Sequence, residues 1–500
     1  MLFNSLDFAI FLPIVFGLYW FVFNKSIKVQ NILILLASYV FYGWWDWRFL
    51  ALIAFSTILD YFIGISIIRA NMKGQKRGLL ALSIIVNIGF LAFFKYYNFF
   101  VDSFIDAFSF FGHSLSLTSL NIILPVGISF YTFQTLSYTI DVYRGTLKPT
   151  KNFVAFASFV SFFPQLVAGP IERASNLLPQ FYKQRKFIYR DAVDGMRQIL
   201  WGLFKKVVIA DNCAIYVNEI FGNSETYNGS TIFLGSIFFA FQIYGDFSGY
   251  SDIAIGTARL FGFDLKQNFA FPYFSRDIAE FWRRWHISLS TWFRDYLYIP
   301  LGGSRGGRFL AVRNTIIVFV VSGFWHGANW TFIFWGAINA FCFLPLLLTS
   351  RNRRNIQIVA TDRIFPKLRE LVSIVVTFLM VVLIWIMFRA DTLSHALHLY
   401  SKIFSLGFFE LPSSELFLNN SIRLFTLTYL SPAIQELLFM IVLLVVFNVI
   451  EWFGRNQKYA IQKCGFLKTT FLRWGFYLLI VLIIIMYSNG EPQEFIYFQF

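Results

Sequence analysis

Repeated apolar runs, each long enough to cross a lipid bilayer, constrain this chain more than any other feature of its sequence. Apolar residues make up 57% of the 500 positions and charged residues only 14%, whereas soluble proteins carry about 25% charged residues. Phe alone occurs 66 times, which is more aromatic surface than a soluble monomer can hide. The sequence therefore predicts an integral membrane protein and excludes disordered, collagen-like and coiled-coil chains.

The apolar runs predict an all-α, polytopic membrane fold in one domain, 1–500. A helix needs about 20 mostly apolar residues to cross a hydrocarbon core of roughly 30 Å. The predicted spans are 8–23, 31–46, 49–68, 79–97, 121–141, 196–217, 231–248, 311–326, 331–348, 371–388, 433–453 and 474–488. Lys205 and Lys206 interrupt 196–217, so an interfacial amphipathic helix is the alternative there.

The placement of Lys and Arg supports this division of the chain. The net charge is +15, and basic residues gather in 171–206 and 256–313, whereas 98–120, 218–230 and 489–500 contain none. Cytoplasmic loops carry the excess of Lys and Arg. The pattern therefore predicts twelve crossings with both termini outside, or eleven crossings plus one segment that dips into the membrane. It explains the positive charge by lipid contact and orientation rather than by nucleic-acid binding.

Two segments are neither spans nor ordinary loops. Prolines and a glycine break the Phe-rich segment 152–172, which predicts a re-entrant segment satisfied by protein or by a water-filled cavity. Segment 249–310 is apolar but studded with Arg, Asp and Trp, and we expect it at the interface or folded into the protein.

Common catalytic motifs are absent from the sequence. It contains no GxxxxGK[ST], no HExxH and no GxSxG, so it predicts no ATP-driven machine, no zinc site and no hydrolase nucleophile elbow. No metal is therefore expected, and any chemistry must come from isolated polar groups inside the membrane.

His326 is the first such group, in the sequence Phe-Trp-His-Gly-Ala-Asn-Trp between two apolar spans. A charged group at bilayer depth costs about 2.5–3.5 kcal/mol, so a titratable residue there is a functional candidate. Gly323 and Gly327 allow another segment or a substrate to approach closely. An imidazole suits general-base chemistry, although a histidine that hydrogen-bonds between helices is an equal alternative.

His286 is the second candidate, in the segment 281–303. If this segment is one helix, His286 and Ser290 share a face, as do Trp285 and Trp292. Glu280 would pair with Arg284 four residues on. A basic interfacial helix with an aromatic belt is the simpler interpretation of the pattern.

The remaining polar groups favour structural roles. His113 is expected in a solvated loop, and His395 and His398 on an interfacial polar face. Asp246 and Asp252 flank glycines near the end of an apolar span, where they could cap a helix that begins near Ser251 or line a cavity.

The two histidine segments, Trp-Arg-Arg-Trp-His-Ile-Ser-Leu followed by Phe-Arg-Asp-Tyr-Leu-Tyr-Ile-Pro-Leu-Gly-Gly, and Phe-Trp-His-Gly-Ala-Asn-Trp, together resemble the membrane-bound O-acyltransferase family. The resemblance extends over most of the chain to about residue 390, with the motif-bearing core at about 121–348. It is strongest to the bacterial branch of alginate O-acetyltransferases and D-alanyl transfer proteins.

This resemblance implies roles for particular residues. It makes His326 the catalytic histidine of the family and His286 the second histidine of the same tunnel, within a ring of helices around a central funnel. The motifs also contribute the expected substrate-binding residues Trp325, Asn329, Arg283, Arg294 and Asp295. Arg283, Arg284 and Arg294 could attract donor phosphates or lipid headgroups.

The implied reaction moves an acyl group from a cytosolic thioester across the membrane toward hydroxyls of an exported cell-surface polysaccharide. The resemblance implies acetyl-CoA as the donor substrate, with no permanently bound cofactor, and an acyl carrier protein as the alternative donor. His326 would act as a base or form an acyl-histidine, and His286 would orient the thioester or polarise its carbonyl. The implied setting is the bacterial cytoplasmic membrane, with an extracytoplasmic acyltransferase or esterase-like partner protein.

Other functions fit part of the same evidence. D-alanyl transfer to a cell-wall polymer is the nearest alternative. A secondary transporter or flippase would also have many spans around a cavity, but such folds usually contain internal repeats, and none is visible in the sequence. A scaffold that only recruits the partner enzyme is a further class.

Overall fold

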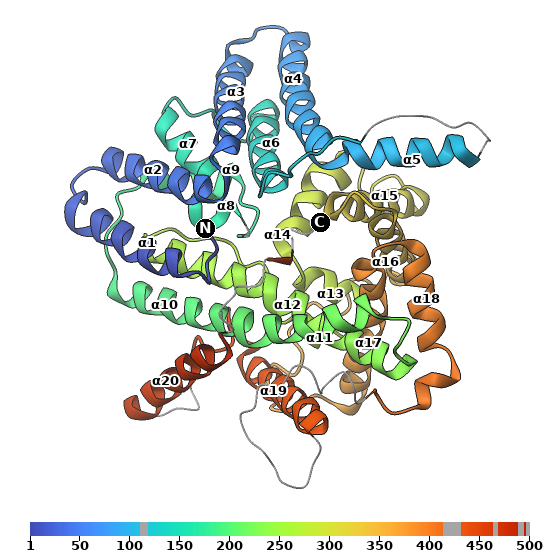
Figure 1. Cartoon of the computed structure of the whole chain (residues 1–500). Helices are drawn as coiled ribbons and strands as arrows, with labels where there is room; N and C mark the ends of the chain where they lie inside the picture. The colour runs from blue at the N-terminus through green and yellow to red at the C-terminus, as the bar shows by residue number, and fades with distance from the viewer. Residues whose placement is uncertain (111–118, 168, 414–431, 464–468, 489–494, 497–500) are drawn as a thin grey trace. The chain divides into compact units, whose positions relative to one another are not determined.

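The computed structural model describes residues 1–110, 119–167, 169–413, 432–463, 469–488 and 495–496. The structure is 74% helical and has no β-strand within these residues (Figure 1). The predicted all-α fold is confirmed.

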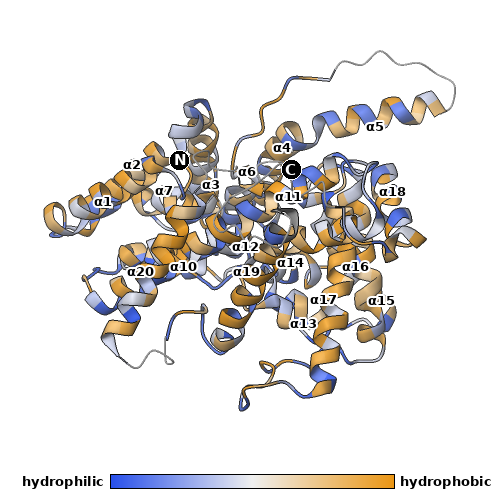
Figure 2. Ribbon diagram, turned by 60° about the horizontal axis from the view of Figure 1, so that its bottom comes forward, coloured by the Kyte–Doolittle hydropathy of each residue, from blue (hydrophilic) through white to orange (hydrophobic). Residues whose placement is uncertain are grey.

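Eight helical stretches among the described residues are long and apolar enough to cross a membrane. They are Ile27–Arg69, Lys73–Phe110, Gly229–Leu260, Arg308–His326, Trp330–Leu348, Leu368–Arg389, Leu437–Gly454 and Thr470–Tyr487. Apolar residues run along their helices in Figure 2. The chain is thus a polytopic membrane protein, as the apolar runs predict.

Three predicted spans differ from simple bilayer-length helices. The first is a shorter apolar helix, Leu6–Val22. Of segment 121–141, only the part from Ile128 onward is helical, in α6 (Ile128–Arg144), which carries Ser, Thr and Gln and is almost wholly buried. Segment 196–217 is divided by a π-helical turn, Phe204–Ala210, in which both lysines are buried within protein.

The chain divides into two compact units, of which the first comprises 1–196 and 253–266. Its complete helices are α1 (Leu6–Gly17), α2 (Ile27–Asp46), α3 (Leu50–Arg69), α4 (Lys73–Leu91), α5 (Tyr97–Phe110), α6, α7 (Phe153–Ser161), α8 (Phe163–Leu166) and α9 (Ala174–Leu177). Helices α3, α4 and α6 pack together around the buried Asp60, which accepts hydrogen bonds from Ser83, Asn87 and Thr139. Within the broken segment 152–172, residues 155–167 and 169–172 are buried in this unit.

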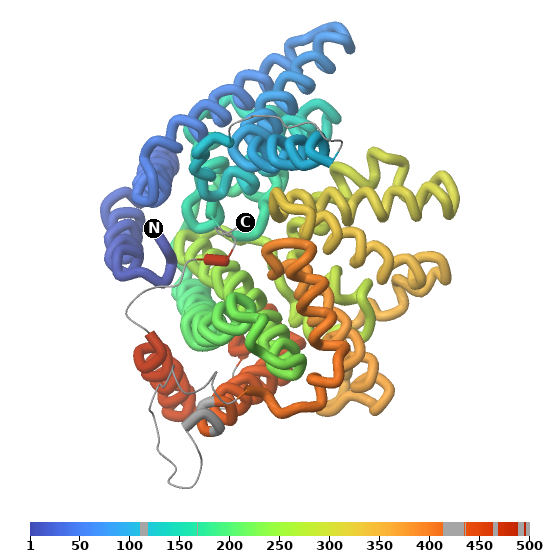
Figure 3. The backbone as a smooth tube through the Cα atoms, turned by 45° about the vertical axis from the view of Figure 1, so that its right-hand side comes forward, coloured from blue at the N-terminus to red at the C-terminus, as the bar shows by residue number. Residues whose placement is uncertain are grey.

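The second unit comprises 197–252 and 267–500, and it contains both candidate histidines. Helix α10 (Tyr189–Leu203) and helix α12 (Gly229–Leu260) belong to both units. The other helices of the second unit are α11 (Asp211–Gly222), α13 (Ile278–Arg284), α14 (Ile287–Phe293), α15 (Arg308–His326), α16 (Trp330–Leu348), α17 (Leu368–Arg389), α18 (Leu393–Ile403), α19 (Pro432–Gly454) and α20 (Thr470–Tyr487). Helices α15 and α16 run side by side (Figure 3).

Candidate active site

His286 lies at a break between two helices. Helix α13 ends at Arg284, and His286 adopts the left-handed conformation (φ 43°, ψ 55°) before α14 begins at Ile287. The prediction of one helix with Trp285 and Trp292 on a shared face is therefore wrong, because the left-handed residue redirects the chain. The Glu280–Arg284 ion pair of α13 is present, with 2.8 Å between Oε1 and Nη2.

Segment 268–270 holds this helix break in place through backbone hydrogen bonds to residues on either side of it. The backbone N–H of Ile287 donates to the carbonyl of Asn268 at 2.9 Å, and that of Ala270 donates to the carbonyl of Arg284 at 2.9 Å. The Asn268 side chain then meets the ring of His286, with 3.1 Å between Oδ1 and Nδ1. A non-glycine residue in a left-handed conformation costs about 1–3 kcal/mol and needs such surrounding support.

His326 is the last residue of α15, where the helix turns into α16. Gly323 and Gly336 allow these helices to touch, because a Cβ atom on Gly323 would overlap the carbonyl oxygen of Phe332 and one on Gly336 that of Phe319. Gly327 breaks the helix with an extended conformation. The glycines thus set the close α15–α16 turn that holds His326 in place.

Aromatic rings enclose both imidazoles. The His326 ring lies 5.0 Å from the Trp325 ring, 5.2 Å from the Trp335 ring and 5.4 Å from the Phe388 ring, measured between centroids. The His286 ring lies 4.6 Å from that of Phe247. These apolar surroundings favour the neutral form of an imidazole.

The two histidines line one cavity of about 600 Å³, a volume typical of small-molecule sites. Their ring centroids are 6.5 Å apart, and their exposed fractions are 1% for His286 and 3% for His326. Both side chains can therefore contact the same bound group in this cavity. The sequence pattern alone did not require the two residues to meet.

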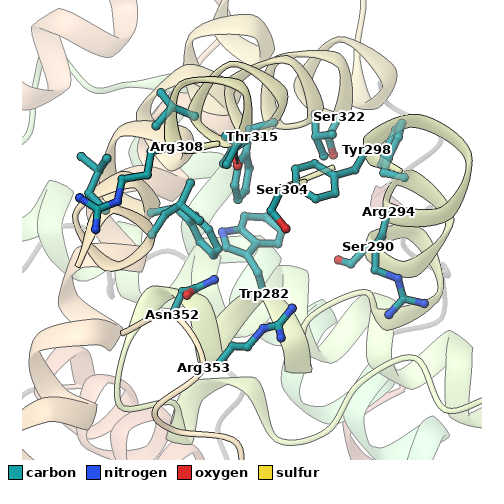
Figure 4. Close-up of a pocket in the computed structure, with 18 of the residues that line it drawn as sticks. Trp282, Ser290, Arg294, Tyr298, Ser304, Arg308, Thr315, Ser322, Asn352 and Arg353 are labelled. Carbon is teal, nitrogen blue, oxygen red and sulfur yellow. Dashed lines mark hydrogen bonds between the residues drawn. The ribbon is translucent and has the colours of Figure 1, made fainter. Parts of the chain in front are cut away.

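The cavity changes from apolar to cationic toward its rim. Trp282, Ser290, Thr315 and Ser322 lie within it, and the exposed side chains of Arg294, Arg308 and Arg353 lie around its edge (Figure 4). Within the described residues no acidic side chain lines it. Such a rim attracts phosphate or carboxylate groups.

Burial controls the protonation of His286. Desolvation lowers the pKa of His286 from 6.5 to about 3, because an apolar environment disfavours the imidazolium. His286 is therefore neutral at physiological pH.

Two of the predicted substrate-binding residues lie beside the cavity. Trp325 is 5% exposed, and its ring lies near both His286, at 6.2 Å, and His326. Arg294 lines the cavity, and its Nε lies 2.6 Å from Oδ1 of Asp295. The hydrogen bond to Asp295 raises the pKa of Arg294, so Asp295 orients this arginine rather than lining the cavity itself.

The other predicted residues face elsewhere. Asn329 caps α16 through a 3.0 Å hydrogen bond from the Thr331 backbone N–H, and its amide donates to the carbonyl of Asp391. Arg283 donates to the carbonyls of Asn352 and Asn355 at 2.6 and 2.9 Å. Neither Asn329 nor Arg283 lines the cavity.

The remaining histidines lie away from the cavity or outside the described residues. His395 and His398 belong to α18, within 3.6 Å of Asp391 and 3.5 Å of Glu225 respectively, in agreement with a polar face. His113 lies outside the described residues.

Asp246 and Asp252 do not cap a helix, because both lie inside α12. Asp246 pairs with Lys206 at 2.8 Å, and Asp252 pairs with Lys205 at 2.5 Å. The sequence analysis missed this buried ion-pair cluster. The two lysines that interrupt segment 196–217 were a signal for it, because buried lysines need carboxylates from elsewhere in the chain as partners.

Sequence reasoning also missed Asn268, Arg308 and Arg353, which lie outside the histidine motifs and have no distinctive pattern of their own. No group of three or more His, Cys, Asp or Glu side chains could hold a metal ion in the part of the chain that the structure describes.

Fold and cavity together define a multi-pass membrane protein with two buried histidines that line one cavity. Comparison with known proteins gives the family: the model of the membrane-bound O-acyltransferase family matches residues 148–388. The chain belongs to the membrane-bound O-acyltransferase family and is an O-acyltransferase.

Its relatives include bacterial enzymes of the cell surface. The chain is 41% identical over 467 residues to the probable alginate O-acetylase of Azotobacter vinelandii, covering 93% of this chain and 87% of the relative. It is 33% identical over 512 residues to the peptidoglycan O-acetyltransferase of Helicobacter pylori, covering 93% and 95%. It is 29% identical over 238 residues to the teichoic acid D-alanyltransferase of Bacillus subtilis, covering 44% and 58%.

Proposed function

We propose that this protein transfers an acetyl group from the thioester of acetyl-CoA, across the bacterial cytoplasmic membrane, toward hydroxyl groups of an exported polysaccharide. The observation that carries the proposal is the single cavity on which His286 and His326 lie, 6.5 Å apart between ring centroids. An extracytoplasmic acyltransferase or esterase-like partner would complete delivery to the polymer.

The relatives favour acetyl over D-alanyl transfer. The two relatives named for O-acetyl transfer align with 93% of this chain. The D-alanyl relative aligns with only 44% of this chain, at the lower identity of 29%. The proposed donor is therefore the CoA thioester rather than an aminoacyl carrier protein.

In the proposed reaction His326 acts as the general base. It takes the proton of the acceptor hydroxyl, the oxygen attacks the thioester carbonyl carbon, and the carbon–sulfur bond breaks. The proton then passes from His326 to the leaving thiolate, so the imidazole is restored. His286 orients the thioester within reach of that oxygen.

The cationic rim suits the donor. Acetyl-CoA carries phosphates, and Arg294, Arg308 and Arg353 offer guanidinium groups that pair well with them. We propose that the CoA phosphates remain at this rim while the acetyl thioester enters toward the histidines.

Surface-glycan analysis tests this function. A strain that lacks the gene is complemented with wild type, His326→Ala or His398→Ala, and ester-linked acetate is released from its exported polysaccharide by mild alkali. We expect acetate with wild type and His398→Ala but none with His326→Ala, at equal levels of protein in the membrane. Wild-type acetate with His326→Ala would contradict the role of this base, and release of D-alanine in place of acetate would contradict the donor.

A further inference from the structure

The amide of Asn268 is positioned to decide which nitrogen of His286 carries the proton. Asn268 is fully buried (0% exposed), and its Oδ1 lies 3.1 Å from Nδ1 of His286. The same oxygen accepts from the hydroxyl of Ser288 at 2.8 Å and from the backbone N–H of Ser288 at 3.3 Å.

The orientation of this amide follows from its partners. A backbone N–H can only donate, so the Asn268 atom that faces Ser288 must be the oxygen rather than the nitrogen. On its other side, Nδ2 of Asn268 donates to the hydroxyl of Ser251 at 3.1 Å. The Ser288 backbone N–H thus assigns the amide, and the Ser251 hydroxyl, which can donate or accept, is compatible with that orientation.

The tautomer of His286 follows in turn. An amide oxygen accepts and cannot donate, so Nδ1 of His286 must carry the hydrogen, and in a neutral imidazole the lone pair is then on Nε2. The low pKa of His286 keeps the ring neutral. Asn268 therefore selects one of two possible forms of a buried ring.

The Nε2 lone pair of His286 lies on the side of the ring that Asn268 and Ser288 leave uncovered, toward the cavity. Nε2 of His286 has no hydrogen-bond partner among the described residues. His286 lines the cavity, whereas Asn268 and Ser288, which cover the Nδ1 side, do not. A buried acceptor of this kind costs free energy unless a ligand satisfies it.

We propose that Asn268, held by Ser251, is a positioning residue that fixes His286 in the Nδ1–H form, so that Nε2 accepts a hydrogen bond from an N–H, O–H or S–H group of the bound substrate. This inference rests on the proposed function for its substrate. It assigns His286 to orienting the substrate and rules out donation from Nε2 to the thioester carbonyl.

The tautomer is measured without any activity assay. Purified full-length protein with ¹⁵N-labelled histidine is compared with His286→Gln by NMR to assign the His286 nitrogens. We expect a protonated Nδ1 and an unprotonated Nε2 in wild type, and loss of this pattern in Asn268→Leu. A protonated Nε2 in wild type, or an unchanged pattern in Asn268→Leu, overturns the inference.

Kinetics supply the second test. Asn268→Leu removes the acceptor, and we expect kcat to fall by about 10- to 100-fold. Asn268→Asp retains the acceptor but adds a charge that favours the imidazolium, so we expect activity to be retained with the acidic limb of the pH profile moved to higher pH. Asn212→Leu removes another buried asparagine, whose amide donates to the carbonyls of Val207 and Val208. It controls for lost stability and should leave the pH profile unmoved.

The outcomes separate this inference from the proposed function. Acyl transfer combined with a protonated Nε2 would overturn the inference and leave the function standing. The expected tautomer in a protein that transfers no acyl group would support the positioning of His286 and contradict the function. An acidic limb that does not move in Asn268→Asp would count against the positioning role.

Discussion

Single buried charges in this protein depend on particular partners. The Nζ atom of Lys206 lies 2.8 Å from Oδ1 of Asp211 and 2.8 Å from Oδ1 of Asp246, with the lysine side chain 1% exposed. Desolvation raises the pKa of Asp211 to about 7, although Lys206 opposes that rise. The lysine is thus the cation that keeps these carboxylates compatible with burial.

Replacement of Lys206 tests that dependence. We expect Lys206→Met to lower the free energy of unfolding by about 3–5 kcal/mol, because it leaves buried carboxylates without their cation. Thermal unfolding of the purified protein in detergent measures the change. Lys148→Met, at an exposed lysine, is the control, and equal melting temperatures for the two variants would refute the prediction.

His286 predicts a pH dependence of stability. Its pKa is lowered by burial from 6.5 to about 3, so the unfolded chain binds a proton at a pH where the folded protein does not. Stability from this group is present above about pH 6.5 and is lost as the pH falls toward 3.

The matching experiment compares melting temperatures between pH 7 and pH 5. We expect the melting temperature of His286→Gln to decrease less steeply with acid than that of wild type, since glutamine does not titrate. Parallel slopes for the two proteins would show that His286 is not protected from protonation.

Sequence alone could locate the two histidines but not what surrounds them. His326 and His286 stand out because titratable residues are rare in apolar segments. Asn268 does not stand out, since its role depends on a left-handed turn at His286, a conformation that only a few per cent of non-glycine residues adopt. The expectation that Asn329 binds substrate overlooked its use as a helix cap, although an Asn directly before an apolar run is a known N-cap signal.

At the scale of elements, the turn between α15 and α16 sets the position of His326. Helix–helix contact in membranes relies on small residues that allow backbones to approach. Gly323 is such a residue, because its Cβ position is occupied by the Phe332 carbonyl oxygen. Any side chain there must separate the two helices.

Gly323→Ala should therefore reduce both stability and activity. A shift of His326 by about 1 Å can cost on the order of 10²-fold in rate, and we expect a loss of that size in acyl transfer. Gly89→Ala in α4, where a Cβ would meet no atom within 4 Å, should leave transfer unchanged. Equal activity in the two variants would mean that the close contact is not required.

The membrane-spanning helices were the most predictable elements, because an apolar run of about 20 residues is the length that a helix needs to cross a bilayer. The division of 196–217 was less predictable, since a π-helical turn that buries two lysines needs acids from α12 that lie about forty residues away. The break at His286 likewise needs hydrogen bonds from segment 268–270.

At the scale of the whole molecule, the apolar composition places the protein in a membrane. The proposed reaction belongs to the second of its two units. Both histidines, their aromatic surroundings and the arginines of the rim belong to that unit. The family match at 148–388 covers every residue that lines the cavity.

The most direct test is the release of CoA thiol from acetyl-CoA by the purified protein in lipid nanodiscs, with the extracytoplasmic partner protein and the acceptor polysaccharide both present. We predict acceptor-dependent thiol release by wild type and by His398→Ala, and release at background level by His286→Ala and His326→Ala. Thiol release at the wild-type rate by the two cavity variants would contradict the claim that the acyl group passes between these histidines.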